Sequence, residues 1–300
     1  MNKSKTPNFL CVGAQKAGTT SLHDILKNHP AIYLPERKEA HFFDNEERYK
    51  KGTNWWMNEF FSTYNDEPIL GAMTPEYLYY SEVPARIAEH LTKDLKLIIV
   101  LRHPVDRAYS HYLMSKRRGF EKHPFEEAIA AESERILQGD FERNHFSYID
   151  RGRYSCQVKR YLDIFPAEKI LFLSFENHIK QGLNDTLKTI QSFLGVEYIE
   201  LNTSIKSNVA SETKSKNVQQ LVNNDNFLKR IIKPLIPKKM RRAMKQKVGQ
   251  INSQEMGTQA KLDTAKRDEL FERYYSDEIE TLKNLTKIDF SYWKEVKEIT

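Results

Sequence analysis

Cysteine is scarce in this chain of 300 residues, which contains only Cys11 and Cys156. Two cysteines cannot build the disulfide framework of a small secreted domain or a four-cysteine zinc site. Long apolar runs are also missing, because the longest, such as Leu97–Leu101, fall far short of the roughly 18 residues that a membrane span needs. The apolar run from Phe9 is too short for the core of a signal peptide. These absences predict a cytoplasmic protein.

Repeats and flexible linkers are absent as well. Neither an internal repeat nor a Gly/Ser-rich or Pro-rich stretch divides the chain, and aromatic residues make up 11% of it, which argues against wholesale disorder. We therefore expect one domain over residues 1–300. Its parts are a core over 8–200, a variable polar and basic segment over 203–262, and a C-terminal helix and aromatic tail over 263–300 that pack on the core.

Apolar runs of strand length alternate along the chain with stretches of helical spacing. We expect strands at Phe9–Val12, Ile69–Met73, Leu95–Leu101 and Lys169–Phe175. We expect helices at Thr19–Lys27, Pro84–Leu91, Asp106–Lys116, Cys156–Ile164 and Arg267–Leu285, the last with Leu270, Tyr274, Ile279 and Leu282 on its apolar face. This alternation predicts a three-layer α/β fold, with a central and mainly parallel sheet flanked by helices.

A glycine-containing loop follows the first predicted strand and leads into the first predicted helix. It reads Gly-Ala-Gln-Lys-Ala-Gly-Thr-Thr-Ser and runs from Gly13 to Ser21. Two glycines flanking four residues are typical of a phosphate-binding P-loop, whose usual pattern is G-x-x-x-x-G-K-[ST]. Thr19 stands where that lysine belongs, and Lys16 lies inside the loop instead. A lysine there can neutralise the charge on a departing group without a metal, although a strand–helix turn that binds nothing is the simpler interpretation of the glycines alone.

The sequence from Gln15 to Leu22 resembles the 5′-phosphosulfate-binding loop of sulfotransferases that use 3′-phosphoadenosine 5′-phosphosulfate (PAPS). It is most similar to a bacterial branch related to the heparan-sulfate sulfotransferases. The resemblance implies a P-loop-type fold, PAPS as donor, adenosine 3′,5′-bisphosphate (PAP) as product, and no metal. It also implies that Lys16 stabilises the leaving phosphate. The residues that it assigns to the donor phosphate are Gln15, Lys16, Ala17, Gly18, Thr19, Thr20 and Ser21.

A second motif follows the strongest predicted strand. Arg102 comes at the end of that strand, and Ser110 lies in the next predicted helix. Taken alone, they could be a surface arginine and a helix serine. The segment resembles the family's 3′-phosphate motif, Arg-Asn-Pro-x-x-Arg-x-x-Ser, with His103 in place of the asparagine. The resemblance therefore implies that Arg102 and Ser110 bind the 3′-phosphate of the donor.

A third motif, Lys-Glu-Ala-His-Phe-Phe-Asp, spans 38–44. Sulfuryl transfer to a hydroxyl or amine needs a base that removes the acceptor's proton, and both Glu39 and His41 are chemically suited. A polar loop before an aromatic core segment would look the same. The motif resembles the Glu-x-His-Phe-Phe-Asp string of heparan-sulfate-type enzymes, which implies Glu39 as base, with His41 as the alternative. Thr74–Tyr77 resembles a further family string, although Met73 stands where those enzymes often have lysine.

Basic residues are concentrated between Lys229 and Lys247, where nine occur without any acid. Subtracting these nine from the formal net charge of +6 leaves −3 for the other residues, so the pI near 9.0 does not indicate nucleic-acid binding. Segment 229–247 also carries apolar residues and is interrupted by Pro234 and Pro237. Three interpretations stay open: a solvated surface, contact with an anionic membrane surface, or contact with a polyanionic acceptor.

Together the motifs predict a sulfotransferase that moves a sulfuryl group from PAPS to a hydroxyl or amine, with a glycan or glycolipid as the favoured acceptor. Two alternatives remain: a P-loop kinase using ATP, and a non-catalytic polyanion-binding protein acting through segment 229–247. The expected location is the cytoplasm, with peripheral contact at the inner face of the membrane if segment 229–247 binds lipid. The sequence predicts no particular oligomeric state.

Overall fold

The computed structural model describes residues 6–204, 211–213, 253–255 and 262–294. The chain forms two compact units. The first contains 1–108, 149–207 and 263–300, and the second contains 109–148 and 208–262. Segment 229–247, with its predicted membrane or acceptor contacts, lies outside the described residues. Among the described residues, no helix combines the length and the apolar character needed to cross a membrane.

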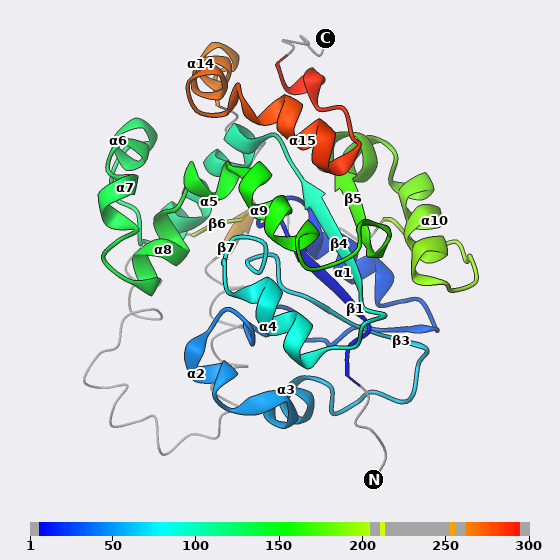
Figure 1. The fold of residues 1–300 in the computed structure, drawn as a ribbon. Coiled ribbons are helices and arrows are strands. Elements are labelled where there is room, and N and C mark those ends of the chain that lie inside the picture. Colours follow the sequence, from blue (N-terminus) through cyan, green and yellow to red (C-terminus); the bar gives the residue numbers. More distant parts are fainter. Residues whose placement is uncertain (1–5, 205–210, 214–252, 256–261, 295–300) are drawn as a thin grey trace, which may run out of the picture. The chain divides into compact units, whose positions relative to one another are not determined.

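A five-stranded parallel sheet forms the core of the first unit (Figure 1). Its strands are β1 (Phe9–Gly13), β2 (Ile32–Tyr33), β3 (Ile69–Met73), β4 (Lys96–Leu101) and β5 (Ile170–Ser174). They lie in the order β2-β3-β1-β4-β5. Every residue of β1 and β3 is buried, as expected for a sheet covered on both faces. The predicted strands are confirmed, and β2 is an addition of only two residues.

Helices flank this sheet (Figure 1). In the first unit they are α1 (Thr19–Leu26), α2 (Glu46–Tyr49), α3 (Gly52–Phe60), α4 (Val83–His90), α9 (Tyr154–Leu162), α10 (Leu183–Leu194), α14 (Thr264–Tyr275) and α15 (Glu278–Thr286). A π-helical turn spans Phe175–Gln181. Helix α9 packs against α15. The predicted three-layer α/β arrangement with a central parallel sheet is confirmed.

One predicted helix is wrong. The apolar spacing over Arg267–Leu285 predicts a single helix, but the structure has two, α14 and α15, separated at Ser276 and Asp277. The Ser276 hydroxyl donates to the Asp277 carboxylate at this break, 3.0 Å away, and such local side-chain bonds are unfavourable inside a helix. Tyr275 is buried in place of the predicted Tyr274. The apolar spacing alone carries no sign of this break.

The second unit is mainly helical. Helix α5 (Pro104–Arg117) begins in the first unit and continues into the second, which also contains α6 (Phe125–Ala130), α7 (Glu132–Arg135) and α8 (Asp140–Phe146). An antiparallel pair, β6 (Ser211–Thr213) and β7 (Ser253–Glu255), belongs to it as well. Buried Glu121 organises the helical part, because its carboxylate accepts hydrogen bonds from Arg135 and Tyr148, each at 2.8 Å.

Candidate active site

The glycine loop connects β1 to α1, and its two glycines occupy tightly packed positions. A Cβ atom added to Gly13 would lie 2.5 Å from the Cβ of Leu78. Gly18 has a φ of 81°, and an added Cβ would lie 3.0 Å from the ring of Phe175. A positive φ is a conformation that glycine adopts readily and other residues do not. Close approach at Gly13 and backbone conformation at Gly18 therefore explain the spacing found in the sequence.

The N-terminus of α1 is suited to bind an anion. Gly18 caps the helix without a side-chain hydrogen bond, and the first turn contains no acidic residue. The first backbone N–H groups of a helix lack partners within the helix, and the helix dipole makes this end positive. The predicted phosphate-binding residues Thr19, Thr20 and Ser21 form this first turn. A phosphate group there would meet backbone donors and hydroxyl groups.

Arg102 lies directly beside the loop. Its Nη1 donates to the carbonyl oxygen of Lys16 at 2.9 Å, and its guanidinium carbon lies 4.7 Å from the ring centre of Phe175. The Arg102 carbonyl accepts from the hydroxyl of Tyr154, which is fully buried. The buried Nε of Arg102 has no hydrogen-bond partner in the described structure. This unsatisfied donor fits a site that is completed by an anion.

The other parts of the second motif have different environments. Ser110 is buried on α5 and belongs to the second unit, so its joint role with Arg102 stays a prediction. His103, the departure from the family pattern, is buried in the first unit, and burial lowers its pKa to about 4. The neutral ring therefore donates from Nε2 to the carbonyl of Trp293, at 3.2 Å. His103 thus packs against the C-terminal tail.

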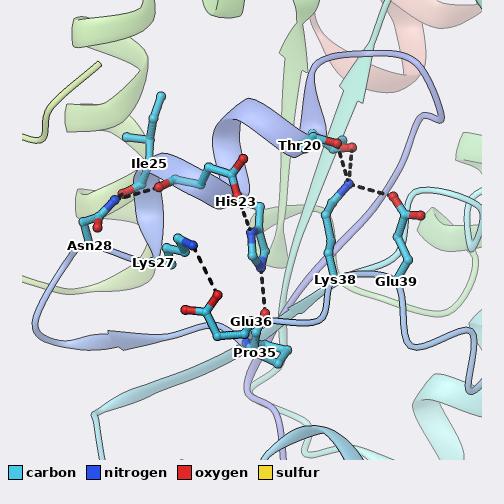
Figure 2. Close-up of polar contacts among 11 residues, drawn as sticks. Thr20, His23, Ile25, Lys27, Asn28, Pro35, Glu36, Lys38 and Glu39 are labelled. Carbon is cyan, nitrogen blue, oxygen red and sulfur yellow. Dashed lines mark hydrogen bonds and ion pairs between the residues drawn. The ribbon is translucent and has the colours of Figure 1, made fainter. Parts of the chain in front are cut away.

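Lys38 joins the glycine loop to the third motif, and sequence reasoning assigned it no role. Its Nζ lies 3.1 Å from Oγ1 of Thr19, 3.2 Å from Oγ1 of Thr20 and 2.9 Å from Oε1 of Glu39. Figure 2 shows the ammonium between the first turn of α1 and the Glu39 carboxylate. The Lys38 side chain is 12% exposed. The only signal in the sequence was a cation immediately before the predicted base.

Glu39 belongs to a cluster of ionisable groups near the end of β3. Its backbone N–H donates to the carbonyl of Met73 at 3.1 Å. One side-chain atom from each of Glu39, His41 and Glu76 lies within 4.8 Å of the other two. Oε1 of Glu76 accepts from Nε2 of Gln15 in the loop at 3.0 Å, and its buried Oε2 has no partner among the described residues. Burial and the charge of Glu39 raise the pKa of Glu76. Sequence reasoning missed Glu76 because it occupies a variable position of its motif.

His41 is positively charged at neutral pH. Its Nδ1 lies 2.8 Å from a carboxylate oxygen of Asp44. Burial opposes the charge, but the hydrogen bond to Asp44 and the charges of Glu76, Asp44 and Glu39 raise the pKa of His41 to about 9. A protonated imidazole cannot act as the base. Glu39, His41 and Glu76, together with Asp44, thus form a charge network around the predicted base.

The three predicted catalytic residues share an uncommon backbone conformation. The φ angles of Lys16, Glu39 and His41 are 72°, 64° and 46°. In the described part of the chain only Asp66 and Lys287 are other non-glycine residues with positive φ. Such conformations cost free energy and are concentrated at functional sites. The catalytic roles of Lys16, Glu39 and His41 stay predictions, because Asp66 and Lys287 share this conformation.

The fold is α/β with a parallel sheet, and its glycine loop leads from a strand to a helix N-terminus. These features define a P-loop-like class of phosphate-binding proteins. The chain belongs to the sulfotransferase domain family, whose sequence profile matches residues 6–260. The resemblance inferred from the motifs is thereby confirmed.

Individual relatives agree with this family. A mouse heparan sulfate glucosamine 3-O-sulfotransferase 3B1 is 32% identical over 193 residues, which cover 64% of this chain and 47% of that protein. A human bifunctional heparan sulfate N-deacetylase/N-sulfotransferase 2 is 31% identical over 213 residues, or 65% of this chain and 23% of that protein. The chain thus spans half or less of these relatives' lengths. The crystal structure of a sulfotransferase from Alicyclobacillus acidocaldarius matches with a TM-score of 0.68 and 27% identity, covering 97% of this chain and 100% of that one.

Proposed function

We propose that this chain is a PAPS-dependent sulfotransferase that acts on a hydroxyl or amine of a glycan. The observation that carries the proposal is the contact of one ammonium, that of Lys38, with both the loop hydroxyls and Glu39. It means that the predicted donor loop and the predicted base lie within one side chain's reach of each other. Transfer between a donor and an acceptor requires this proximity.

The residues around the loop fit the donor. We assign its 5′-phosphate to residues 15–21 at the N-terminus of α1, and its 3′-phosphate to Arg102 and Ser110. The uncapped helix end and the unpartnered Nε of Arg102 support this assignment. When bound, PAPS supplies an activated sulfuryl group. No metal is assigned a role, because loop and helix donors, Lys16 and Arg102 can balance the donor's negative charge.

Glu39 is the proposed base. It accepts the proton of the attacking hydroxyl or amine as the new bond to sulfur forms. The bond between sulfur and the 5′-phosphate oxygen breaks in the same transfer, PAP leaves, and Lys16 stabilises the negative charge that develops on that oxygen. His41 is the weaker candidate for the base, because its pKa of about 9 keeps it protonated at neutral pH. We assign His41 instead to the charge network around Glu39.

A glycan is the favoured acceptor because the relatives of known activity are named for heparan sulfate. Met73 stands where the resembling enzymes often have lysine, so the proposal does not carry over their detailed acceptor specificity. Glycolipid acceptors and peripheral membrane contact through segment 229–247 remain proposals that concern residues outside the described structure.

Two variants, assayed for sulfate transfer from PAPS and for stabilisation by PAP, test the function. Lys16→Ala and Glu39→Gln should each lower the rate of sulfate transfer from PAPS to heparan-type acceptors by about 100-fold or more. Glu39→Gln should still be stabilised thermally by PAP, because the base does not bind that product. Wild-type rates in either variant would refute the assigned role.

The same measurements separate the alternative functions. A kinase would be stabilised by ATP–Mg²⁺ and not by PAP. A polyanion-binding protein would show salt-dependent binding that survives Lys16→Ala and Arg102→Ala, without stabilisation by either nucleotide. The sulfotransferase should be stabilised by PAP and not by ATP–Mg²⁺.

A further inference from the structure

We propose that Lys38 is a donor-site residue that also controls the base: its ammonium binds the anionic 5′ end of the donor and thereby releases Glu39. This inference rests on the proposed function, because it concerns the same two sites. It assigns a role to a residue that the motifs did not select.

The contacts of Lys38 leave its two threonine partners ready to bind an anion. An ammonium has three donors and no acceptor, and Lys38 directs them to Thr19, Thr20 and Glu39. Since the ammonium donates to the hydroxyl oxygens, the hydroxyl hydrogens of Thr19 and Thr20 must point to other acceptors. Phosphate and sulfuryl oxygens are acceptors of this kind.

Lys38 also replaces a missing charge. A common P-loop places lysine directly after its second glycine, where this chain has Thr19. The Lys38 ammonium reaches the hydroxyl of that same residue from another segment of the chain. Its side chain is 12% exposed, so water screens its charge less than that of a surface lysine. Lys38 thus supplies a positive charge beside the first turn of α1, which contains no lysine or arginine of its own.

The bond to Glu39 gives Lys38 its second effect. An ammonium 2.9 Å from Oε1 of Glu39 stabilises the carboxylate and makes it a weaker base. Anionic oxygens at the loop compete for the same ammonium. As Lys38 turns to them, Glu39 regains its basicity, so that donor binding prepares the base before an acceptor is deprotonated.

A double-mutant cycle measures this competition directly. The variants are Lys38→Met, Glu39→Gln and the pair, and the readout is calorimetric binding of PAPS and of PAP without acceptor. Lys38→Met should weaken PAPS binding about tenfold or more. Glu39→Gln should tighten it by about fivefold, because the ammonium loses its competitor, and this gain should vanish in the pair. A larger loss for PAPS than for PAP assigns the ammonium to the sulfuryl group, and equal losses assign it to the 5′-phosphate.

Lys27→Met is the matched control. Lys27 lies at the end of α1 and pairs with exposed Glu36 at 3.4 Å, away from the loop (Figure 2). Its loss should leave both affinities unchanged. Wild-type PAPS affinity in Lys38→Met, or in Glu39→Gln, would overturn the proposal. If Lys38→Met does not fold, the affinity of Glu39→Gln for PAPS tests the proposal by itself. If the wild type binds neither nucleotide, the proposed function itself fails.

Discussion

At the scale of single residues, neighbouring carboxyl groups determine what His41 can do. Histidine is suited by type to act as a base, and that made it a candidate. In the fold, however, Asp44 forms a hydrogen bond to its ring, and Glu39 and Glu76 lie close by. These charges outweigh the effect of burial and raise the pKa of His41. The same residue type can therefore be a base or a fixed cation, depending on side chains that the fold brings to it.

This environment predicts the titration of His41. Its NMR resonances should titrate near pH 9, and Asp44→Asn should lower the pKa by roughly one unit or more. Because the folded-state pKa is raised, the pair stabilises the fold fully below the unfolded pKa of 6.5, and the stabilisation is lost as the pH rises through about 9. The difference in Tm between wild type and Asp44→Asn should thus be large at about pH 6 and shrink towards pH 9. Titration of His41 near 6.5 in the wild type would contradict this prediction.

At the scale of elements, Gly18 holds the loop against the π-helical turn. Gly18→Ala forces alanine into a φ of 81° and brings its Cβ to about 3.0 Å from the Phe175 ring. We expect a loss of about 1–3 kcal/mol in the free energy of unfolding, together with weaker PAP binding. Gly52→Ala is the control, because Gly52 has a φ of 76° but nothing within 4 Å of an added Cβ. Denaturant unfolding should show a smaller loss for Gly52→Ala, and equal losses would exclude a packing role.

The elements also show how far the sequence alone predicts this molecule. The strand at Ile69–Met73 agrees with the structure residue for residue, because burial on both faces produces a continuous apolar run. The loop from Gly13 was found because its pattern is contiguous. The break at Ser276 was missed, since apolar spacing continues through it. Lys38 and Glu76 were missed because their contacts, with Thr19 and Gln15, join segments that are distant in the sequence.

At the scale of the whole chain, the first unit combines three separate segments of the sequence. The last of them, 263–300, contacts residues next to Arg102. The indole of Trp293 donates to Oε2 of Glu176 at 3.2 Å, and Oε1 of Glu176 accepts from the backbone N–H of His103 at 2.9 Å. His103 directly follows Arg102, the proposed 3′-phosphate ligand. The C-terminal tail thus contacts the backbone next to this proposed donor-binding residue, which lies almost two hundred positions earlier in the sequence.

This connection predicts a coupled loss of stability and binding. Trp293 is 1% exposed, so Trp293→Ala should cost about 3–5 kcal/mol in the free energy of unfolding. It should also weaken PAP binding measured at a temperature where the variant is folded, because His103 loses both Trp293 and the ordered Glu176. Trp293→Phe retains a ring and removes the N–H donor. If Trp293→Phe loses less stability than Trp293→Ala but the same PAP affinity, the hydrogen bond to Glu176 positions Arg102. If both variants bind PAP as tightly as the wild type, the tail contributes only packing.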